Sequence, residues 1–488
     1  MSLATPVSRL LSRVPALWTS GPLRESLFYA LGLIATRAVS LLMLPVNTHF
    51  LSVSDYGRLE VLLALADVGA VVFGLALPTT LSRFVGAVEA WDERRKVCAH
   101  VFAVAILTSG LLAVVGFAAA GEIARLLPGD PDALEVRLLV GTLSMEGILG
   151  VGLTWLRIRG AAGTFFTLSI GRAVLFASLS ATLLVMGYGL KGVLAAGATA
   201  ALAQGLACSL VVLRETGVRL KGIEWGPFTL FSGPLLLSAL AMFALGSLDR
   251  WFLADAVGTA ELGIYGVAVR LGAMTAVLLQ PFHMWWFPKR FIVLNEPFGV
   301  PRSAHVVGIG LVIIMVSAMA VSLGGPLVLE LMTPPAYHPA IYLIPWIALI
   351  YGVQETSSLL ELGSYLRRDG FIPLATNLFG AAVVVTLYWL LIPPYGVAGA
   401  IAATLTAQVA RTILVHVVSQ YYKRLPYDFG RLGLVLAVAA ASTAVCFLFL
   451  KGAWIFAGGV VAVPLTAATA YALGLLSPYR PPAQDEAG

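Results

Sequence analysis

Long apolar segments, separated by short loops that hold most of the charged residues, follow one another along this chain. Hydrophobic residues make up 59% of the 488 and charged residues only 11%, against about 25% charged residues in soluble proteins. So few charges cannot cover the surface of a soluble protein of this length. A soluble enzyme, a nucleic-acid-binding module and a disordered protein are therefore excluded, and an all-α polytopic membrane protein is predicted.

The apolar segments predict fourteen transmembrane helices. Most contain at least about 20 residues, enough to cross about 30 Å of hydrocarbon as a helix. Helices are expected because lipid offers no hydrogen-bond partner to an unpaired backbone group. The predicted spans are 26–50, 58–83, 97–120, 137–158, 163–187, 190–213, 229–251, 262–286, 303–324, 340–364, 371–392, 396–421, 431–450 and 453–475.

The basic residues predict the orientation, because loops on the cytoplasmic side are rich in Lys and Arg. Of the 31 Lys and Arg residues, twenty fall on the side of the N-terminus. The opposite side holds six: Arg58, Arg125, Arg137, Lys191, Arg250 and Lys451. Both termini are therefore predicted to be cytoplasmic, and the positive net charge reflects topology rather than a nucleic-acid partner.

An internal repeat divides the chain. Tyr188–Ala196 recurs as Tyr395–Ala403 at an offset of 207, and Leu156–Gly160 recurs as Leu366–Gly370 at an offset of 210. Spans 1–6 and 7–12 are therefore predicted to be two six-helix bundles with a cavity between them. The predicted parts are a cytoplasmic segment 1–25 (an interfacial helix or a frayed tail), a bundle 26–213, a linker 214–228, a bundle 229–421, an extra helix pair 431–475 and a cytoplasmic tail 476–488.

Motifs of enzymatic chemistry are absent from the sequence. It contains no phosphate-binding loop of an ATPase, no His-Glu-x-x-His and no Gly-x-Ser-x-Gly. Its three cysteines match neither a disulfide framework nor a zinc site. We therefore expect a transporter rather than an enzyme, without a cofactor or a metal.

Charged residues inside the predicted spans are the candidate functional residues. They are Arg37, Arg172, Arg270 and Arg411, and the acids Asp67, Glu146 and Glu355. Each charge costs about 2.5–3.5 kcal/mol at the bilayer centre, so each must face a partner or a watery cavity. The four arginines are interpreted as a cationic, substrate-binding cavity. The alternative is a set of ion pairs between helices, such as Arg37 with Asp67.

Two of the acids occupy equivalent positions in the repeat. Glu146 and Glu355 are 209 residues apart, which is within the range of the repeat offset. Such a pair could carry a coupling ion, H⁺ or Na⁺. It could equally support helix contacts in each bundle.

Three motifs carry a family resemblance. Leu51–Gly57 reads LSVSDYG, Asp249–Tyr265 contains DRWFL followed by ELGIY, and Pro394–Thr404 reads PYGVAGAIAAT. In this order, over roughly residues 25–425, they resemble the oligosaccharide flippases of the Wzx type. These polysaccharide transporters share a superfamily with lipid II flippases and multidrug and toxin extruders.

The resemblance implies a substrate and a mechanism. A polyprenyl-diphosphate-linked oligosaccharide, on undecaprenyl, would enter the cavity from the cytoplasmic leaflet and leave in the periplasmic leaflet by alternating access, for surface polysaccharide such as O-antigen or exopolysaccharide. Arg37 and Arg270 would border the lateral opening of the cavity. The partners would be membrane lipids and polysaccharide polymerase or assembly proteins, and the location would be the bacterial inner membrane.

Other functions remain open at this point. A multidrug exporter of the superfamily has twelve spans, without a C-terminal pair. A lipid II flippase has fourteen, but its first span differs in sequence. A major-facilitator carrier would show Gly-x-x-x-Asp-Arg-x-Gly-Arg after span 2, where this chain lacks it. A non-transporting subunit of a polysaccharide synthase complex is the fourth alternative.

The predicted orientation can be tested by labelling single cysteines from outside the cell. A cysteine in the 121–136 or the 326–338 loop should react with a membrane-impermeant thiol reagent, and a cysteine at 94 or 367 should not. The reverse pattern would contradict the orientation, which follows from the distribution of Lys and Arg.

Overall fold

The computed structural model describes residues 32, 39, 41–221, 225–366, 371–477 and 479. Within these ranges every regular element is a helix, as predicted. The chain forms two compact units, of which the first comprises residues up to Leu51 and Leu62–Leu236, and the second Ser52–Val61 and the residues from Leu237 on. Most of predicted span 1, including Arg37, lies outside the described residues.

The units divide the chain differently from the repeat. The boundary at Leu236 falls inside predicted span 229–251, and the first residues of α3, Val53–Val61, belong to the second unit. The division into 26–213 and 229–421 stays a prediction. The described helices that lie wholly or partly in the first unit are α3 (Val53–Gly74), α4 (Leu77–Gly86), α5 (Trp91–Leu126), α6 (Ala133–Leu143), α7 (Glu146–Ile158), α8 (Ala162–Val185), α9 (Gly189–Glu215) and α10 (Trp225–Gly246), with α3 and α10 each divided between the units.

The first unit has an apolar core where α4, α5, α7 and α9 meet. Leu81, Phe102, Trp155 and Val212 are fully buried there. Trp155 also donates a hydrogen bond from Nε1 to Glu215 at 2.8 Å. This core joins the start of α5 to the ends of α7 and α9.

Basic residues gather at the same end of this unit. His100 Nε2 lies 3.0 Å from the carbonyl oxygen of Lys221, which brings the start of α5 to the segment after α9. Arg159, after α7, pairs with Glu215. At the opposite end, Lys191 pairs with Asp132. The basic residues therefore separate as the topology predicts, and the side of the membrane that each end faces stays a prediction.

The second unit contains the remaining helices. They are α11 (Asp249–Gly272), α12 (Met274–Trp286), α13 (Arg290–Leu294), α14 (Gly299–Met332), η1 (Pro335–Tyr342), α15 (Ile344–Leu360), η2 (Glu361–Tyr365), α16 (Phe371–Tyr422), α17 (Phe429–Phe449) and α18 (Ala453–Ala472).

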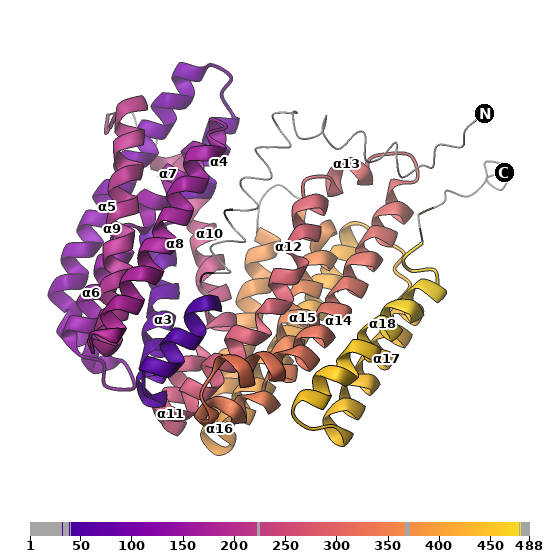
Figure 1. Cartoon of the computed structure of the whole chain (residues 1–488). Coiled ribbons are helices and arrows are strands. Elements are labelled where there is room, and N and C mark those ends of the chain that lie inside the picture. Colours follow the sequence, from indigo (N-terminus) through magenta and orange to yellow (C-terminus); the bar gives the residue numbers. More distant parts are fainter. Residues whose placement is uncertain are drawn as a thin grey trace, which may run out of the picture. The chain divides into compact units, whose positions relative to one another are not determined.

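The helix α14 lies at the centre of the second unit's core. Its Leu311 and Val312 are buried in one cluster with Trp286 of α12 and Val435 of α17. A second cluster joins Leu323 to residues of α17 and α18. Figure 1 shows α17 and α18 packed beside α14. The extra helix pair predicted at 431–475 therefore packs on predicted span 9.

Two of the long helical elements fold back on themselves at a glycine. Gly258 (φ 84°) lies inside α11 and Gly396 (φ 54°) inside α16. The Tyr388 hydroxyl lies 2.8 Å from Thr404 Oγ1 across 16 residues of α16, although a continuous helix would separate them by about 24 Å. Only glycine adopts such left-handed backbone angles at low cost. Gly189, which corresponds to Gly396 in the repeat, also has a φ of 54°.

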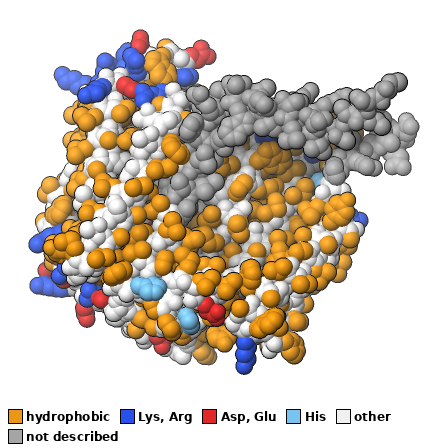
Figure 2. Space-filling model, in the orientation of Figure 1, with side chains coloured by type: hydrophobic (Ala, Val, Ile, Leu, Met, Phe, Trp, Pro, Cys, Tyr) orange, Lys and Arg blue, Asp and Glu red, His pale blue; other side chains and the backbone are white. Residues whose placement is uncertain are grey.

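Length and composition allow ten of the described helical segments to cross a membrane, or eleven if the bent pair Pro335–Tyr342 and Ile344–Tyr365 is one span. Two of the ten, Thr229–Trp286 and Phe371–Tyr422, contain the reversals at Gly258 and Gly396. The count of fourteen stays a prediction. Hydrophobic side chains cover most of the molecular face in Figure 2, as expected for surfaces in contact with lipid.

Several spans are interrupted where the sequence predicted continuous helices. Predicted span 58–83 breaks at Leu75 and Ala76, which have positive φ angles. Predicted span 137–158 breaks between α6 and α7, so that Glu146 begins α7 rather than lying in the middle of a helix. A carboxylate is favourable in the first turn because the helix dipole is positive there.

The reversal in α16 can be tested by a substitution that fills its closest approach. A Cβ atom at Gly399 would lie 2.0 Å from the carbonyl oxygen of Leu391. Gly399→Ala should therefore lower the melting temperature of the purified protein, since overpacking costs about 1–3 kcal/mol. Gly308→Ala in α14 is the control, because a Cβ atom there would meet no atom within 4 Å. Equal melting temperatures for the two variants would contradict the tight reversal.

Candidate functional site

A network of buried charges occupies the second unit. Glu60 Oε2 accepts a hydrogen bond from Arg250 Nε at 3.1 Å, and Glu60 Oε1 accepts one from Arg270 Nη2 at 3.4 Å. Asp249 accepts a hydrogen bond from the Tyr265 hydroxyl and lies 3.5 Å from Arg250. Glu60, Asp249 and Arg250 are each less than 10% exposed. Charges so buried are stable only when paired and hydrogen-bonded.

A close approach of two backbones builds this network. A Cβ atom at Gly263 of α11 would lie 2.3 Å from the carbonyl oxygen of Val53, so a larger residue could not occupy this position. The hydroxyls of Ser54 and Thr259 lie 2.7 Å apart at the same contact. The first turns of α3 therefore pack directly on α11, which places Glu60 beside Arg250.

Most of this network was not predicted from the sequence. Arg250 was predicted to lie on the side opposite the termini, but its burial was not predicted. Glu60 and Asp249 were not among the candidate residues. The sequence did indicate that Glu60 needs a buried partner, because it is the one charged residue in the apolar segment Leu59–Leu63. Of the predicted residues that the structure describes, only Arg270 belongs to the network, where it forms an ion pair between α11 and α3.

A second polar cluster lies farther along α15. Arg411 donates from Nε to Asn377 at 2.9 Å and from Nη1 to Ser357 at 3.1 Å. Arg411 is only 6% exposed. It also interacts electrostatically with Glu361. This predicted residue therefore holds α15 and both parts of α16 together.

Glu355 has an imidazole as its partner. Its Oε2 lies 3.6 Å from Nδ1 of His283 on α12, and the two side chains are 13% and 11% exposed. Glu361, which influences Glu355 electrostatically, lies 3.7 Å from Arg290. Among the described residues, Nε2 of His283 has no hydrogen-bond partner.

Glu146 has a different partner in the first unit. Its Oε1 lies 3.5 Å from Arg172 Nη2, with both side chains about one third exposed. The sequence placed Glu146 and Glu355 at equivalent positions, yet one faces a guanidinium and the other an imidazole. Asp67 is exposed on α3. The proposed pairing of Arg37 with Asp67 lies outside the described residues.

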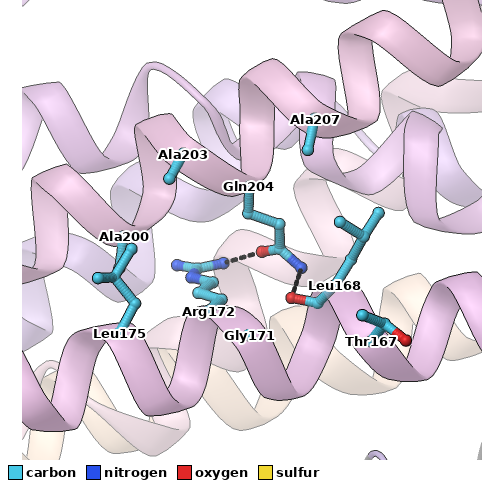
Figure 3. A pocket seen from close by; sticks show the side chains of 9 residues that line it. All are labelled: Thr167, Leu168, Gly171, Arg172, Leu175, Ala200, Ala203, Gln204 and Ala207. Atoms are coloured by element: carbon cyan, nitrogen blue, oxygen red, sulfur yellow. Dashed lines mark hydrogen bonds between the residues drawn. The ribbon is translucent and has the colours of Figure 1, made fainter.

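Arg172 lines a small open pocket between α8 and α9, with a volume of about 180 Å³. Gln204 lies opposite, and its Oε1 accepts a hydrogen bond from Arg172 Nη1 at 3.4 Å. Figure 3 shows these two side chains facing each other among small and apolar residues. A cation in a mainly apolar pocket fits an anionic group better than a neutral one.

Side chains that commonly bind metal ions do not gather in the described part of the chain. No group of three or more His, Cys, Asp or Glu side chains there could hold a metal ion. The polar clusters contain cations, carboxylates and phenols, which suit the binding of anions and protons.

Sequence comparison assigns the family. Residues 23–290, more than half of the chain, match the family described as polysaccharide biosynthesis protein. The chain belongs to this family. The resemblance inferred from the motifs is thereby confirmed at the family level. No curated protein sequence matches the chain.

Solved structures show the fold of this polysaccharide biosynthesis protein. The structure of a lipid II flippase MurJ in an inward closed conformation matches with a TM-score of 0.70 at 9% identity. The match covers 92% of this chain and 99% of the MurJ chain. A MATE transporter in complex with MaL6 has a TM-score of 0.55 at 15% identity, with coverages of 82% and 95%. A MOP superfamily transporter from Pyrococcus furiosus has 0.55 at 16%, with the same coverages. The chain therefore has the MOP transporter fold.

The buried network can be tested by removing its central carboxylate. Glu60→Ala should lower the free energy of unfolding by about 3–5 kcal/mol, because it removes the carboxylate partner of Arg270 and leaves the buried Arg250 with Asp249 alone. Thermal melting in detergent measures the change. Glu122→Ala removes an acid from the exposed pair with Arg125 and should cost at most about 1 kcal/mol. A Glu60 variant as stable as the Glu122 variant would contradict the structural role of the network.

Proposed function

We propose that this protein is a flippase that moves a polyprenyl-diphosphate-linked oligosaccharide from the cytoplasmic to the periplasmic leaflet. The proposal includes alternating access, fourteen transmembrane helices, cytoplasmic termini and an inner-membrane location. The observation that carries it is family membership in polysaccharide biosynthesis combined with a transporter fold. A diphosphate headgroup needs cationic partners in an apolar environment.

The candidate cations are the four predicted arginines. Their exposure and their existing partners indicate which of them could contact the substrate. Arg411 is buried and hydrogen-bonded to two side chains. Arg270 is paired with Glu60 and is 20% exposed. Arg172 is the most exposed of the three described arginines. We therefore place Arg172 first for contact with the substrate, whereas the sequence had favoured Arg37 and Arg270.

The extent of the structural matches favours a lipid-linked substrate over a drug-like one. The MATE match covers 82% of the chain, and the lipid II flippase match covers 92%. The additional coverage is comparable to the length of the C-terminal pair, α17 and α18. A lipid II flippase is therefore the second candidate function, favoured by the TM-score of 0.70.

Ion coupling is proposed at His283 and Glu355 in the second unit. An imidazole beside a carboxylate at 3.6 Å, both nearly buried, can share one proton and so change charge with the conformation of the transporter. Glu361 and Arg290 are the neighbouring charged groups. H⁺ is therefore preferred to Na⁺ as the coupling ion.

Complementation distinguishes the candidate functions. The gene should restore surface polysaccharide to a strain that lacks its oligosaccharide flippase, and it should not support growth of a strain depleted of its lipid II flippase. Glu355→Gln should reduce the restored polysaccharide at normal membrane abundance, because the amide cannot release a proton. The opposite pattern of complementation would assign the protein to lipid II transport. Full activity of Glu355→Gln across a range of pH would exclude coupling at that residue.

A further inference from the structure

Two arginines occupy corresponding places in the two copies of the repeat, although they stand on different helices. Gln204 corresponds to Arg411 at an offset of 207, and Arg172 corresponds to Gly380 at an offset of 208. At Gly380, a Cβ atom would lie 3.0 Å from Cδ of Arg411, so the arginine lies against the glycine. Each copy therefore holds one guanidinium group between its fifth and sixth predicted spans.

The two guanidinium groups differ in how tightly they are held. Arg411 has hydrogen bonds of 2.9 and 3.1 Å and is 6% exposed. Arg172 has contacts of 3.4 Å to Gln204 and 3.5 Å to Glu146, and its side chain is 33% exposed. Charge-assisted hydrogen bonds normally measure about 2.7–2.9 Å. Arg172 is thus held by longer contacts and is more exposed than Arg411.

The surroundings of Arg172 leave room for a ligand. The pocket beside Arg172 has a volume of about 180 Å³ and is open to its surroundings. Gln204 donates from Nε2 to the Leu168 carbonyl oxygen at 3.2 Å, which turns its Oε1 toward Arg172. The rest of the wall consists of Gly171, alanines of α9, two leucines and Thr167 (Figure 3), whose hydroxyl donates to the Gly163 carbonyl oxygen. The walls therefore offer an approaching anion one main partner, the guanidinium group.

We propose that this pocket binds the diphosphate of the lipid-linked substrate, and that Glu146 competes with the diphosphate for Arg172. This inference rests on the proposed flippase function and specifies the contact. Arginine binds phosphate oxygens through two parallel N–H donors, and those that face Glu146 and Gln204 are the available ones. Glu146 carries the same charge as the ligand, so it must move away when the diphosphate binds. Its return to Arg172 releases the substrate.

The competition predicts opposite effects for the two partners of one ion pair. Arg172→Gln should weaken binding of farnesyl diphosphate to the purified protein by about tenfold or more, because a hydrogen-bonded charge pair is lost. Glu146→Gln should strengthen binding, because it removes the competing charge. Isothermal titration in detergent measures both affinities. Arg172→Lys, which keeps the charge but lacks the paired donors, should be intermediate and replaces Arg172→Gln if that variant fails to fold.

Control ligands identify the source of the anion. Farnesol lacks the diphosphate and should not bind, and inorganic pyrophosphate lacks the lipid and should bind more weakly than farnesyl diphosphate. Equal binding of pyrophosphate and farnesyl diphosphate would overturn the assignment to a lipid-linked ligand. Arg125→Gln removes a cation from an exposed pair in the same unit and should leave the affinity unchanged.

The results distinguish a failure of this binding site from a failure of the proposed flippase function. If both pocket variants melt at lower temperature and bind farnesyl diphosphate like the unmodified protein, the pair is structural and the site is wrong, while flippase function stands. If affinities change in opposite directions but the gene fails to complement a flippase-deficient strain, the site stands and the function falls. Weaker binding in Glu146→Gln would overturn the competition.

Discussion

A guanidinium group inside an apolar helical protein needs hydrogen-bond acceptors around it, and this need decides which helices pack together. Desolvation of an isolated charge costs several kcal/mol. In the second unit, Arg250 and Arg270 converge on Glu60 and thereby hold the first turns of α3 against α11. Arg411 similarly connects α15 to both parts of α16. Each of these arginines therefore links segments that are distant in sequence.

Arg172 differs from these arginines, and the difference supports its proposed role in substrate binding. Its contacts are long, a third of its side chain is exposed, and a pocket opens beside it. Arg411, which has a packing role, has shorter hydrogen bonds and is only 6% exposed. Incomplete pairing costs stability, and such costs are typical of residues that bind ligands. Arg411 thus serves packing, whereas we propose that Arg172 makes an exchangeable contact with the substrate.

The helical architecture could be predicted from the sequence because the lipid environment demands it. Apolar length determines the spans, and the extra pair at 431–475 was predicted near its observed bounds in α17 and α18. The breaks beside Ala76 and before Glu146 were not predicted, because apolar composition does not distinguish a continuous helix from an interrupted one. The reversal at Gly396 was marked by prolines and glycines in Pro393–Gly399.

The partners of the charged residues could not be predicted, because they depend on packing between segments far apart in sequence. The sequence identified Arg270 and Arg411 as charges needing partners, but Glu60 and Asn377 follow only from the structure. Equivalent positions in the repeat were expected to have equivalent roles. Glu146 and Glu355 instead face an arginine and a histidine, which are supplied by helices that the offset between the two acids does not specify.

Transport by the purified protein would show whether it moves a lipid-linked oligosaccharide across a membrane. The protein is reconstituted into liposomes with a fluorescent polyprenyl-diphosphate oligosaccharide, and a membrane-impermeant enzyme that modifies the sugar reports accessible headgroups over time. We expect protected headgroups to become accessible in the presence of the protein. Arg172→Gln should remove this effect when equal amounts of protein are reconstituted. Accessibility no greater than in protein-free liposomes would contradict the flippase assignment.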